Sequence, residues 1–477
     1  MMVAYHPAIH ILDFLTPRAA FPSDTIPTTQ ARVAVLYTVC DDFDSIAFKS
    51  CVQAARQVGG QVYVLDDSRQ EPMWDRIIDA LQENGLVHIV RREYPRAFKA
   101  GNINDAIKTQ LLHERYDYII LADADEILPP SASATLAATL DANSNIAFVQ
   151  LAHASRADEA SWFAKVMRVM TDVKYRYYRK YTNQYGLPLS HGHGVAIRLA
   201  LLKHGLPEII SEDIAMSIDL RQAGYRGLFL TEPLCQESAV RDLATFCRRE
   251  RRCMAADVEC FACKVLPMII ARGIGLIEKW DLFVRELRYP IKLLFPLTTV
   301  WAVLSSISGW PNNDEIGLTG PVSKACWVSA ALIPWASYFR FLGIQGILPT
   351  LDFLLVSLPT HIGCMIVYLE GAVIGLWRAI QGGQLMPEEP DAGWIWIPTR
   401  ARGQNTPSIL GDLLRYLTPG LVIATVGATW SQWELTSIGA CLIAQWIATR
   451  QPLGPKVGSF IVRVAGCGMI LALLMYV

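Results

Sequence analysis

The stretch that most constrains the fold is the apolar run Tyr118–Ala122, which ends abruptly in Asp123, Asp125 and Glu126. The run is short for a helix and predicts a buried strand of an α/β sheet. At the carboxyl end of such a strand, the chain leaves the sheet at the crevice where ligands bind. Neighbouring carboxylates repel there unless a cation lies between them, and Mg²⁺ or Mn²⁺ carrying a diphosphate is the usual answer. The alternative is a solvated corner between strand and loop.

Strand and helix patterns alternate around this run. Strands are predicted at 32–39, 61–65, 87–90, 118–122 and 146–151, and helices at 45–58, at 73–84 and from the turn 96–104 to about 113. This alternation predicts a mostly parallel sheet with right-handed crossovers.

Three of the predicted strands end in polar corners that would gather at one sheet edge. The corners hold Thr38, the pair Asp66 and Asp67, and the pair Asp123 and Asp125. No Gly-x-Gly-x-x-Gly follows the first strand and no Walker lysine pattern occurs, so the clustering favours a nucleotide-sugar site over a dinucleotide site. Lys99, on its glycine-containing turn, would neutralise a carboxylate or meet a phosphate; otherwise it is an exposed lysine at a helix entry.

Downstream, the chain becomes aromatic and basic and then offers a second acidic pair. The aromatic residues suit either sugar stacking or core packing: Phe163, Tyr175, Tyr177, Tyr178, Tyr181 and Tyr185. The turn 191–194 either provides a His-x-His metal pair, His191 and His193, or forms a tight loop that faces an acceptor sugar with His193 and Gly194. Ser211 is a candidate N-cap, with Glu212 and Asp213 in the first helical turn, where the dipole favours anions. The second of these acids is a candidate general base.

Together these residues resemble a family 2 glycosyltransferase of the membrane-embedded cellulose synthase and hyaluronan synthase type, over about residues 32–265. The resemblance implies a GT-A type α/β nucleotide-sugar-binding domain followed by an α-helical transmembrane domain. It places the uridine of a UDP-sugar on Thr38, Asp66 and Asp67, and the diphosphate beside Lys99. Asp123 and Asp125 would bind the metal and diphosphate. The motif Ser211-Glu212-Asp213 would supply the base, Asp213, for an inverting transfer.

One motif departs from the family. Its Gln-x-x-Arg-Trp, on an interface helix, aligns with Arg249–Cys253. Arg252 keeps the position of the phosphate-binding arginine, and Arg249 stands where the family has glutamine. Cys253 replaces the tryptophan that lies under the acceptor sugar. The departure leaves the transfer chemistry intact and bears on processivity or on the acceptor.

Composition divides the chain. The net charge of −1 argues against a nucleic-acid partner. Residues up to about 260 read as soluble, whereas long apolar segments dominate after about 288. The N-terminus has no signal-peptide layout, so a cytoplasmic catalytic half is expected. The eleven cysteines fit a reducing compartment; Cys247, Cys253, Cys260 and Cys263 are expected to be buried helix thiols, with a zinc site as the alternative.

The apolar half predicts about five membrane spans. Candidate spans are 289–310, 324–344, 347–379, 413–430, 434–448 and 457–477. Arginines favour a cytoplasmic loop at 381–412, so one of the first three candidates would be interfacial or re-entrant. Within that loop, Trp396, Thr399 and Arg400 resemble the gating loop of cellulose synthases; a plain basic loop is the alternative.

The expected division is a tail at 1–30, a cytoplasmic glycosyltransferase domain at 31–245, interface helices at 246–288 and a transmembrane domain at 289–477. The expected function is building a β-linked polysaccharide or oligosaccharide at the bacterial inner membrane and passing it across. One rival is a non-processive enzyme acting on a membrane lipid; another is an inactive subunit of a secretion complex. Expected partners are a UDP-sugar, a glycan or lipid acceptor and membrane lipids, with accessory subunits or a second copy of the chain as further candidates.

Overall fold

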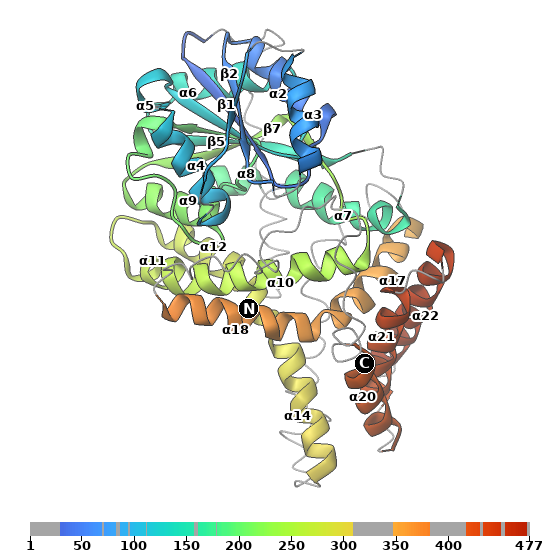
Figure 1. Ribbon diagram of the computed structural model, residues 1–477. Helices are drawn as coiled ribbons and strands as arrows, with labels where there is room; N and C mark the ends of the chain where they lie inside the picture. Colours follow the sequence, from blue (N-terminus) through green and yellow to red (C-terminus); the bar gives the residue numbers. More distant parts are fainter. Residues whose placement is uncertain are drawn as a thin grey trace.

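The computed structural model describes residues 29–68, 71–82, 86–93, 96–110, 112–156, 161–177, 179–308, 347–381, 416–429, 433–449 and 454–474. A seven-stranded sheet covered by helices forms the upper part of the molecule in Figure 1, and helices make up the rest. The strands are β1 Val33–Val39, β2 Gln61–Asp66, β3 Val87–Val90, β4 Tyr118–Asp123, β5 Ile146–Ser155, β6 Val195–Arg198 and β7 Arg226–Glu237.

The helices of the sheet domain are α2 Ser45–Arg56, α3 Glu71–Gln82, α4 Phe98–Thr109, α5 Leu112–Arg115, α6 Ala132–Ala142, α7 Trp162–Tyr177, α8 Arg179–Gln184 and α9 Glu212–Gln222. They are followed by α10 Leu243–Cys260, α11 Leu266–Ile270, α12 Leu276–Glu286, α13 Arg288–Lys292, α14 Leu294–Ser308, α17 Ile347–Gly363, α18 Met365–Ile380, α20 Thr418–Thr429, α21 Trp433–Thr449 and α22 Gly454–Leu474.

The strand order is β3-β2-β1-β4-β6-β5-β7. Strands β3, β2, β1 and β4 run parallel, β5 and β7 are parallel to each other, and β6 runs antiparallel to both of its neighbours. Every residue of β1 is buried, as expected for a central strand that has apolar cover on both faces. The predicted α/β class with a mostly parallel sheet is confirmed, with β6 as the antiparallel member.

The register of the parallel strands aligns their polar ends. Thr38 of β1 lies opposite Asp123 of β4, and Val39 lies opposite Asp66 of β2. Polar residues that are far apart in sequence therefore meet at one sheet edge, as the strand pattern predicted.

Below the sheet, α10 and α18 lie along each other (Figure 1). Gly371 and Gly375 allow this close approach: a Cβ at Gly371 would lie 2.5 Å from the Arg251 carbonyl oxygen, and one at Gly375 would lie 2.4 Å from that of Ala255. Because small residues one helical turn apart let backbones touch, the position of α18 against α10 is closely fixed.

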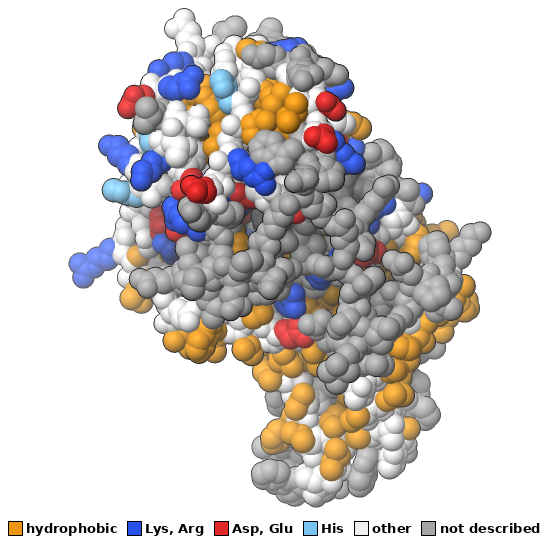
Figure 2. All heavy atoms as spheres, viewed as in Figure 1, with side chains coloured by type: hydrophobic (Ala, Val, Ile, Leu, Met, Phe, Trp, Pro, Cys, Tyr) orange, Lys and Arg blue, Asp and Glu red, His pale blue; other side chains and the backbone are white. Residues whose placement is uncertain are grey.

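Apolar helices extend away from this layer. Among the described residues, Pro290–Ser308 is long and apolar enough to cross a bilayer, and α17 with α18, bent by 53°, could form a second span. Three shorter apolar helices lie at Thr418–Thr429, Leu435–Ile447 and Val457–Met469. In Figure 2, hydrophobic side chains gather over this lower part, around α14. The candidate span 324–344 lies outside the described residues.

The contact between α18 and α10 can be tested with Gly375→Ala. The added methyl group would meet backbone, so we expect the free energy of unfolding to fall by about 1–3 kcal/mol. Gly468→Ala on α22 is the matched control, because a Cβ there meets nothing within 4 Å. The control should leave stability unchanged or raise it by up to about 1 kcal/mol. Thermal unfolding of the detergent-solubilised protein measures both, and equal melting temperatures for the two variants would contradict the packing described.

Candidate active site

The centre of the candidate site is Asp123, at the end of β4. Its Oδ1 accepts a hydrogen bond from Thr38 Oγ1 (3.3 Å) and pairs with Nζ of the buried Lys99. Lys99 also donates to the carbonyl oxygen of Gly192 at 3.0 Å. Strand β1, the turn before α4, strand β4 and the loop before β6 thus meet at one carboxylate. The predicted grouping of Thr38, Lys99 and Asp123 is what the structure contains.

A strained turn presents Lys99. Ala97 and Phe98 have φ of 52° and 50°, in the left-handed region that non-glycine residues rarely adopt. Arg92, which the sequence argument missed, supports the turn by donating to the carbonyl oxygen of Phe98 at 3.1 Å. Its guanidinium also donates hydrogen bonds to both carboxylate oxygens of Asp67, at 2.9 and 2.7 Å. Such strain persists only where the surroundings hold it, and Arg92 is part of that support.

The two acids at the end of β2 have different surroundings. Asp67 is paired with Arg92. Asp66 is fully buried; its Oδ1 accepts from the Ser68 amide at 2.8 Å, and its Oδ2 has no hydrogen-bond partner among the described residues. A buried acceptor without a donor is costly unless a ligand supplies one. Asp66 is therefore the better placed of the pair to meet a ligand N–H.

The acidic cluster lacks enough positive charge. Burial and then the Asp123 and Glu237 carboxylates raise the pKa of Asp125 to about 7. Asp42, for which the sequence predicted no role, has a pKa raised well above its ordinary value, chiefly by burial and also by Asp125 and Asp123. Crowded carboxylate oxygens are the ligands that Mg²⁺ and Mn²⁺ prefer, so the donor set fits a divalent cation at Asp123 and Asp125.

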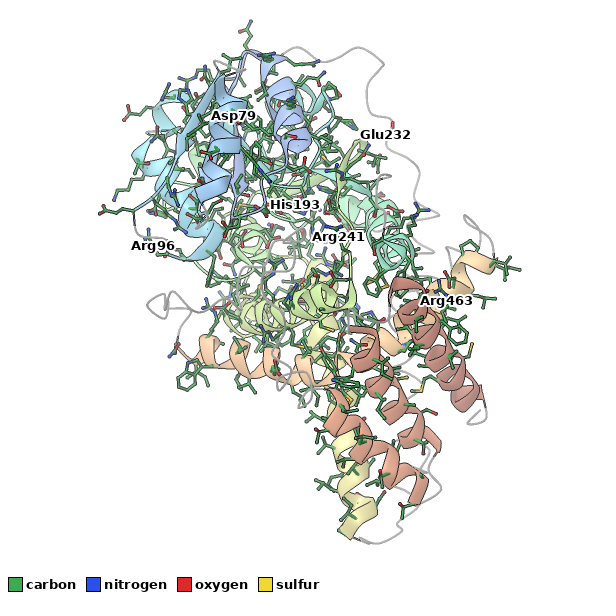
Figure 3. All side chains as sticks on the ribbon, turned by 45° about the vertical axis from the view of Figure 1, so that its right-hand side comes forward. Asp79, Arg96, His193, Glu232, Arg241 and Arg463 are labelled. Carbon is green, nitrogen blue, oxygen red and sulfur yellow. The ribbon has the colours of Figure 1, made fainter. Side chains whose placement is uncertain are left out.

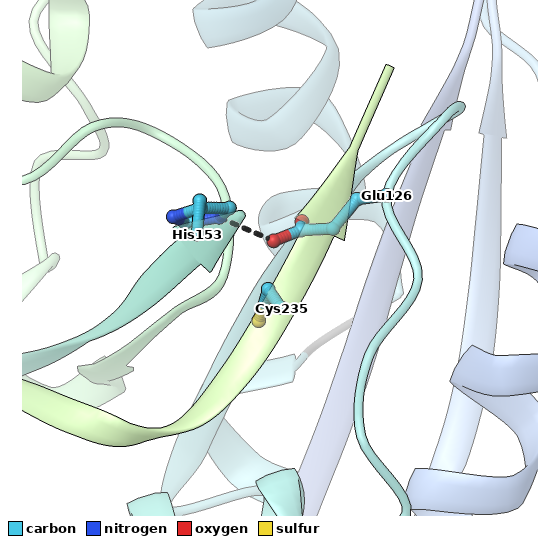
Figure 4. A group of neighbouring side chains, drawn as sticks. All are labelled: Glu126, His153 and Cys235. Carbon is cyan, nitrogen blue, oxygen red and sulfur yellow. Dashed lines mark hydrogen bonds and ion pairs between the residues drawn. The ribbon is translucent and has the colours of Figure 1, made fainter. Parts of the chain in front are cut away.

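Glu126, the next acid in the chain, joins the acidic strand end to the loop before β6. Its carboxylate is fully buried and accepts from His153 Nε2 at 2.7 Å (Figure 4). It also accepts from the Gly194 amide at 2.9 Å and from the Asp123 amide at 3.3 Å. Cys235 lies beside it, within the distance that metal ligands share. Because hydrogen bonds already satisfy the carboxylate, the arrangement favours a positioning role over a metal site for these three side chains.

His193 lies against the same carboxylate, between the sheet and the helices below it (Figure 3). Its Nδ1 is 3.5 Å from Glu126, and its Nε2 is 3.6 Å from Glu237. Burial alone would lower the pKa of His193, but Glu126 and Asp123 outweigh it and raise the pKa to about 10. His193 is thus a second fixed cation beside Asp123. His191 packs its ring against Phe229. The possible metal-binding group that contains His193 is completed by His153 and Glu237, and a His191–His193 metal pair stays a prediction.

Gln150 of β5 fixes the loop that carries His193. Its Nε2 donates to the carbonyl oxygens of His193 (2.8 Å) and Gly194 (3.2 Å), and its Oε1 accepts from the His191 amide (2.9 Å). Gly192, with φ of 78°, passes so close to Asp213 that a Cβ would lie 3.4 Å from Asp213 Oδ2. The loop predicted to face an acceptor therefore adjoins the candidate base. Neither Gln150 nor Glu126 could be given this role from sequence, because their partners come from the turn before β6.

Asp213 stands at the start of α9. Ser211 is the N-cap residue, as predicted, although its side chain makes no capping hydrogen bond. Ser217 instead ties the helix to the loop: its hydroxyl donates to the Asp213 carbonyl oxygen (2.7 Å) and accepts from the Ser190 amide (2.8 Å). Burial and the Asp213 carboxylate raise the pKa of Glu212 to about 8, with Lys99 opposing the rise.

The remaining predicted residues lie on α10 or beyond the described chain. Arg249 places its guanidinium 5.2 Å from the Phe246 ring centroid and 3.7 Å from Glu250. Arg252 is half-buried, and Cys253 packs against the apolar cluster that α10 shares with α17 and α18. Trp396, Thr399 and Arg400 lie outside the described residues.

Of the four clustered cysteines, Cys253 and Cys263 are only half-buried, so the expectation of buried thiols holds for two of the four. Cys247 and Cys260 are buried, and Cys247 Sγ lies 3.3 Å from Cys364 Sγ at the start of α18. Among the described residues, these cysteines are free thiols and form no metal-binding group.

Comparison with known proteins finds glycosyltransferases by family, by sequence and by structure. Residues 118–343 match the family described as glycosyl transferase family group 2. Curated relatives include the glucans biosynthesis glucosyltransferase H of Nitrosomonas europaea, 23% identical over 265 residues (49% of this chain and 30% of the relative). The protein of that name from Rhodopseudomonas palustris is 24% identical over 259 residues, which cover 48% of this chain and 35% of the relative. The chain thus spans about a third of the length of these relatives.

Similar solved structures include the following two. One is the mannosyltransferase PcManGT of Pyrobaculum calidifontis in complex with GDP-Man and Mn²⁺, with a TM-score of 0.47 and 16% identity over 79% of this chain and 97% of that one. The other is the glucosyl-3-phosphoglycerate synthase of Mycobacterium tuberculosis in complex with Mn²⁺, UDP and phosphoglyceric acid. Its TM-score is 0.34, with 20% identity over 50% of this chain and 82% of that one.

Glu212→Gln should change how stability depends on pH. Because the folded-state pKa of Glu212 is raised above its unfolded value, wild-type stability from this group is complete at low pH and is lost as pH rises toward 8. The glutamine variant has no such titration. Its stability relative to wild type should grow between about pH 4.5 and 8, by at most about 1.4 kcal/mol per pH unit, and then level off. Denaturant unfolding across this range measures the difference; a constant difference would contradict the assignment.

Proposed function

We propose that this chain, which carries a glycosyltransferase family 2 domain, is a membrane-embedded inverting hexosyltransferase that uses a UDP-sugar and extends a β-linked glycan. One observation carries the proposal: four separate segments bring Thr38, Lys99, Asp123 and the loop beside Asp213 to one sheet edge. Donor-binding charges and a candidate base are thus adjacent, as sugar transfer requires.

The donor would lie along the carboxyl ends of β2, β1 and β4. The buried Oδ2 of Asp66, which has no hydrogen-bond partner among the described residues, would accept the imide N–H of a uracil ring, and Arg92 holds Asp67 beside it. Lys99 and His193 bring fixed positive charge to the place where a diphosphate gains negative charge on leaving. Such preorganised charge is typically the largest contribution to lowering a transfer barrier. Arg252 is proposed to add to it from α10.

Asp123 and Asp125 would hold a divalent cation. When bound, Mg²⁺ or Mn²⁺ would supply Lewis-acid stabilisation of the leaving diphosphate. The chain's own groups prepare for this: Lys99 and Thr38 fix one oxygen of Asp123, and the Ser238 amide donates to Asp125 Oδ2 at 3.3 Å. The Glu126 contacts hold the strand end in place.

Asp213 is the proposed general base. It adjoins Gly192, whose carbonyl oxygen binds Lys99, so an acceptor hydroxyl at this loop would lie between the base and the donor. Glu212, whose raised pKa keeps it protonated near neutral pH, limits the negative charge beside Asp213. The base would take the hydroxyl proton while that oxygen attacks the anomeric carbon opposite the leaving diphosphate, which inverts the sugar.

The chain is proposed to lie at a membrane through α14 and the bent pair α17 and α18. The domain limits expected from the sequence, 31–245, 246–288 and 289–477, remain part of this proposal, with the catalytic half in the bacterial cytoplasm and the glycan passed across the membrane. Cys253 favours a second candidate, a non-processive transferase for a membrane lipid, because a thiol offers no aromatic platform for an acceptor sugar. Product analysis with radiolabelled UDP-sugars separates the two: a glycolipid carrying a single sugar would favour the second.

Asp213→Asn tests the base. We expect transfer, measured as UDP release with a panel of UDP-sugars, to fall about 10²- to 10⁴-fold, while the affinity for the donor stays close to that of wild type. Asp219→Asn, on the same helix and paired with Lys264 at 2.8 Å, is the matched control and should retain activity. An Asp213→Asn protein as active as this control would contradict the assignment of Asp213 as the general base.

Asp125→Asn tests the cation site without relying on turnover. Removing one carboxylate of a two-carboxylate site should weaken Mn²⁺ binding at least about 10-fold, as read from the free Mn²⁺ signal in electron paramagnetic resonance titrations. Asp117→Asn is the control: Asp117 precedes the same strand at its opposite end and pairs with Arg32 at 3.0 Å. Equal Mn²⁺ affinity in the two variants would remove Asp125 from the site.

A further inference from the structure

A buried ion pair links α18 to the sheet domain. Arg378, in the last turn of α18, donates from Nε to Glu259 Oε1 at 3.0 Å, and both side chains are almost completely buried. Glu259 belongs to α10, so the pair joins two helices that are far apart in sequence. A second pair on the same helices, Arg251 with Glu370 at 3.3 Å, is more exposed.

The two members of the buried pair each reach a different part of the candidate site. The second oxygen of Glu259 accepts the backbone N–H of Ile210 at 3.1 Å, directly before Ser211, Glu212 and Asp213. The guanidinium of Arg378 lies 5.8 Å from the ring centroid of Phe98, within cation–π range. Phe98 precedes Lys99 in the strained turn. One ion pair therefore contacts the segments that carry the candidate base and the candidate diphosphate lysine.

We propose that Arg378 and Glu259 are positioning residues that hold the segments of Asp213 and Lys99 in register with each other from α18. The inference rests on the proposed function only in taking Asp213 as base and Lys99 as diphosphate ligand. Its physical basis is that a buried ion pair is intolerant of losing one partner, because the other is left charged and uncompensated. The close contact of Gly371 and Gly375 with α10 gives the pair a firm support.

Small displacements of these segments would matter for transfer. A shift of about 1 Å in a reacting group can lower a rate about 100-fold, even when the mutated residue lies away from the chemistry. Arg378→Met removes the charge and the planar contact on Phe98 and leaves Glu259 unpaired. Arg378→Lys keeps a positive charge for Glu259 but loses the flat guanidinium over Phe98. It therefore distinguishes the contact with Glu259 from the contact with Phe98.

Amide hydrogen exchange of the full chain in detergent, followed by mass spectrometry, reports on both segments independently of activity. In Arg378→Met, exchange in residues 207–214 and 96–104 should accelerate at least about 10-fold. In Arg378→Lys, only residues 96–104 should accelerate. Glu370→Gln is the matched control, because its ion pair with Arg251 joins the same two helices; both segments should exchange as in wild type.

Activity provides the second readout. UDP release per folded molecule should fall about 10- to 100-fold in Arg378→Met, fall less in Arg378→Lys and stay near wild type in Glu370→Gln. If Arg378→Met does not fold, Arg378→Lys still tests the inference, because its hydrogen exchange should accelerate in residues 96–104 and not in residues 207–214. Exchange and turnover in the Arg378 variants equal to those of Glu370→Gln would overturn the inference. A wild-type protein that uses no UDP-sugar would overturn the proposed function instead, while hydrogen exchange would still decide the positioning role.

Discussion

Crowding of buried carboxylates at one sheet edge is the constraint on which the rest of the site depends. Asp42, Asp123, Asp125, Glu126 and Glu237 lie close enough to influence one another's ionisation. Lys99 and His193 are the cations whose charge reaches Asp123. Bringing so many like charges together is unfavourable unless fixed donors and a ligand compensate for it, so the hydrogen bonds around Glu126 and the backbone strain before Lys99 are understandable as its local consequences.

The sequence predicted β1 to β5, whose signals are local, but it did not predict β6 or β7. Apolar runs that end in acids gave β1, β2 and β4, and the parallel alternation followed from helices between them. It predicted the grouping of Thr38, Lys99 and Asp123 for the same reason, since parallel strands end at one edge. A single helix to residue 113 was expected, whereas the structure has two helices, α4 and α5.

What the sequence could not supply are partners drawn from distant segments. Arg92 belongs to no recognisable motif, yet its guanidinium donates hydrogen bonds both to Asp67 and to the Phe98 carbonyl oxygen in the turn before Lys99. Gln150 and Glu126 look like ordinary residues of a strand and a corner until the loop before β6 is placed against them. The orientation of α18 was also inaccessible, because an apolar pattern with one glutamate and one arginine gives no indication that it lies along α10.

Because α18 packs along α10, the helical part of the chain contacts the catalytic part although the two are far apart in sequence. A fragment ending at residue 288 would contain every strand and the candidate base, yet it would lack Arg378 and leave Glu259 as a buried carboxylate without its counter-ion. It would also uncover the backbone of α10 that Gly371 and Gly375 normally touch. Attempts to crystallise or assay the sheet domain alone should therefore use fragments that retain α18, because truncation at the apparent domain border would cut through the support of the site.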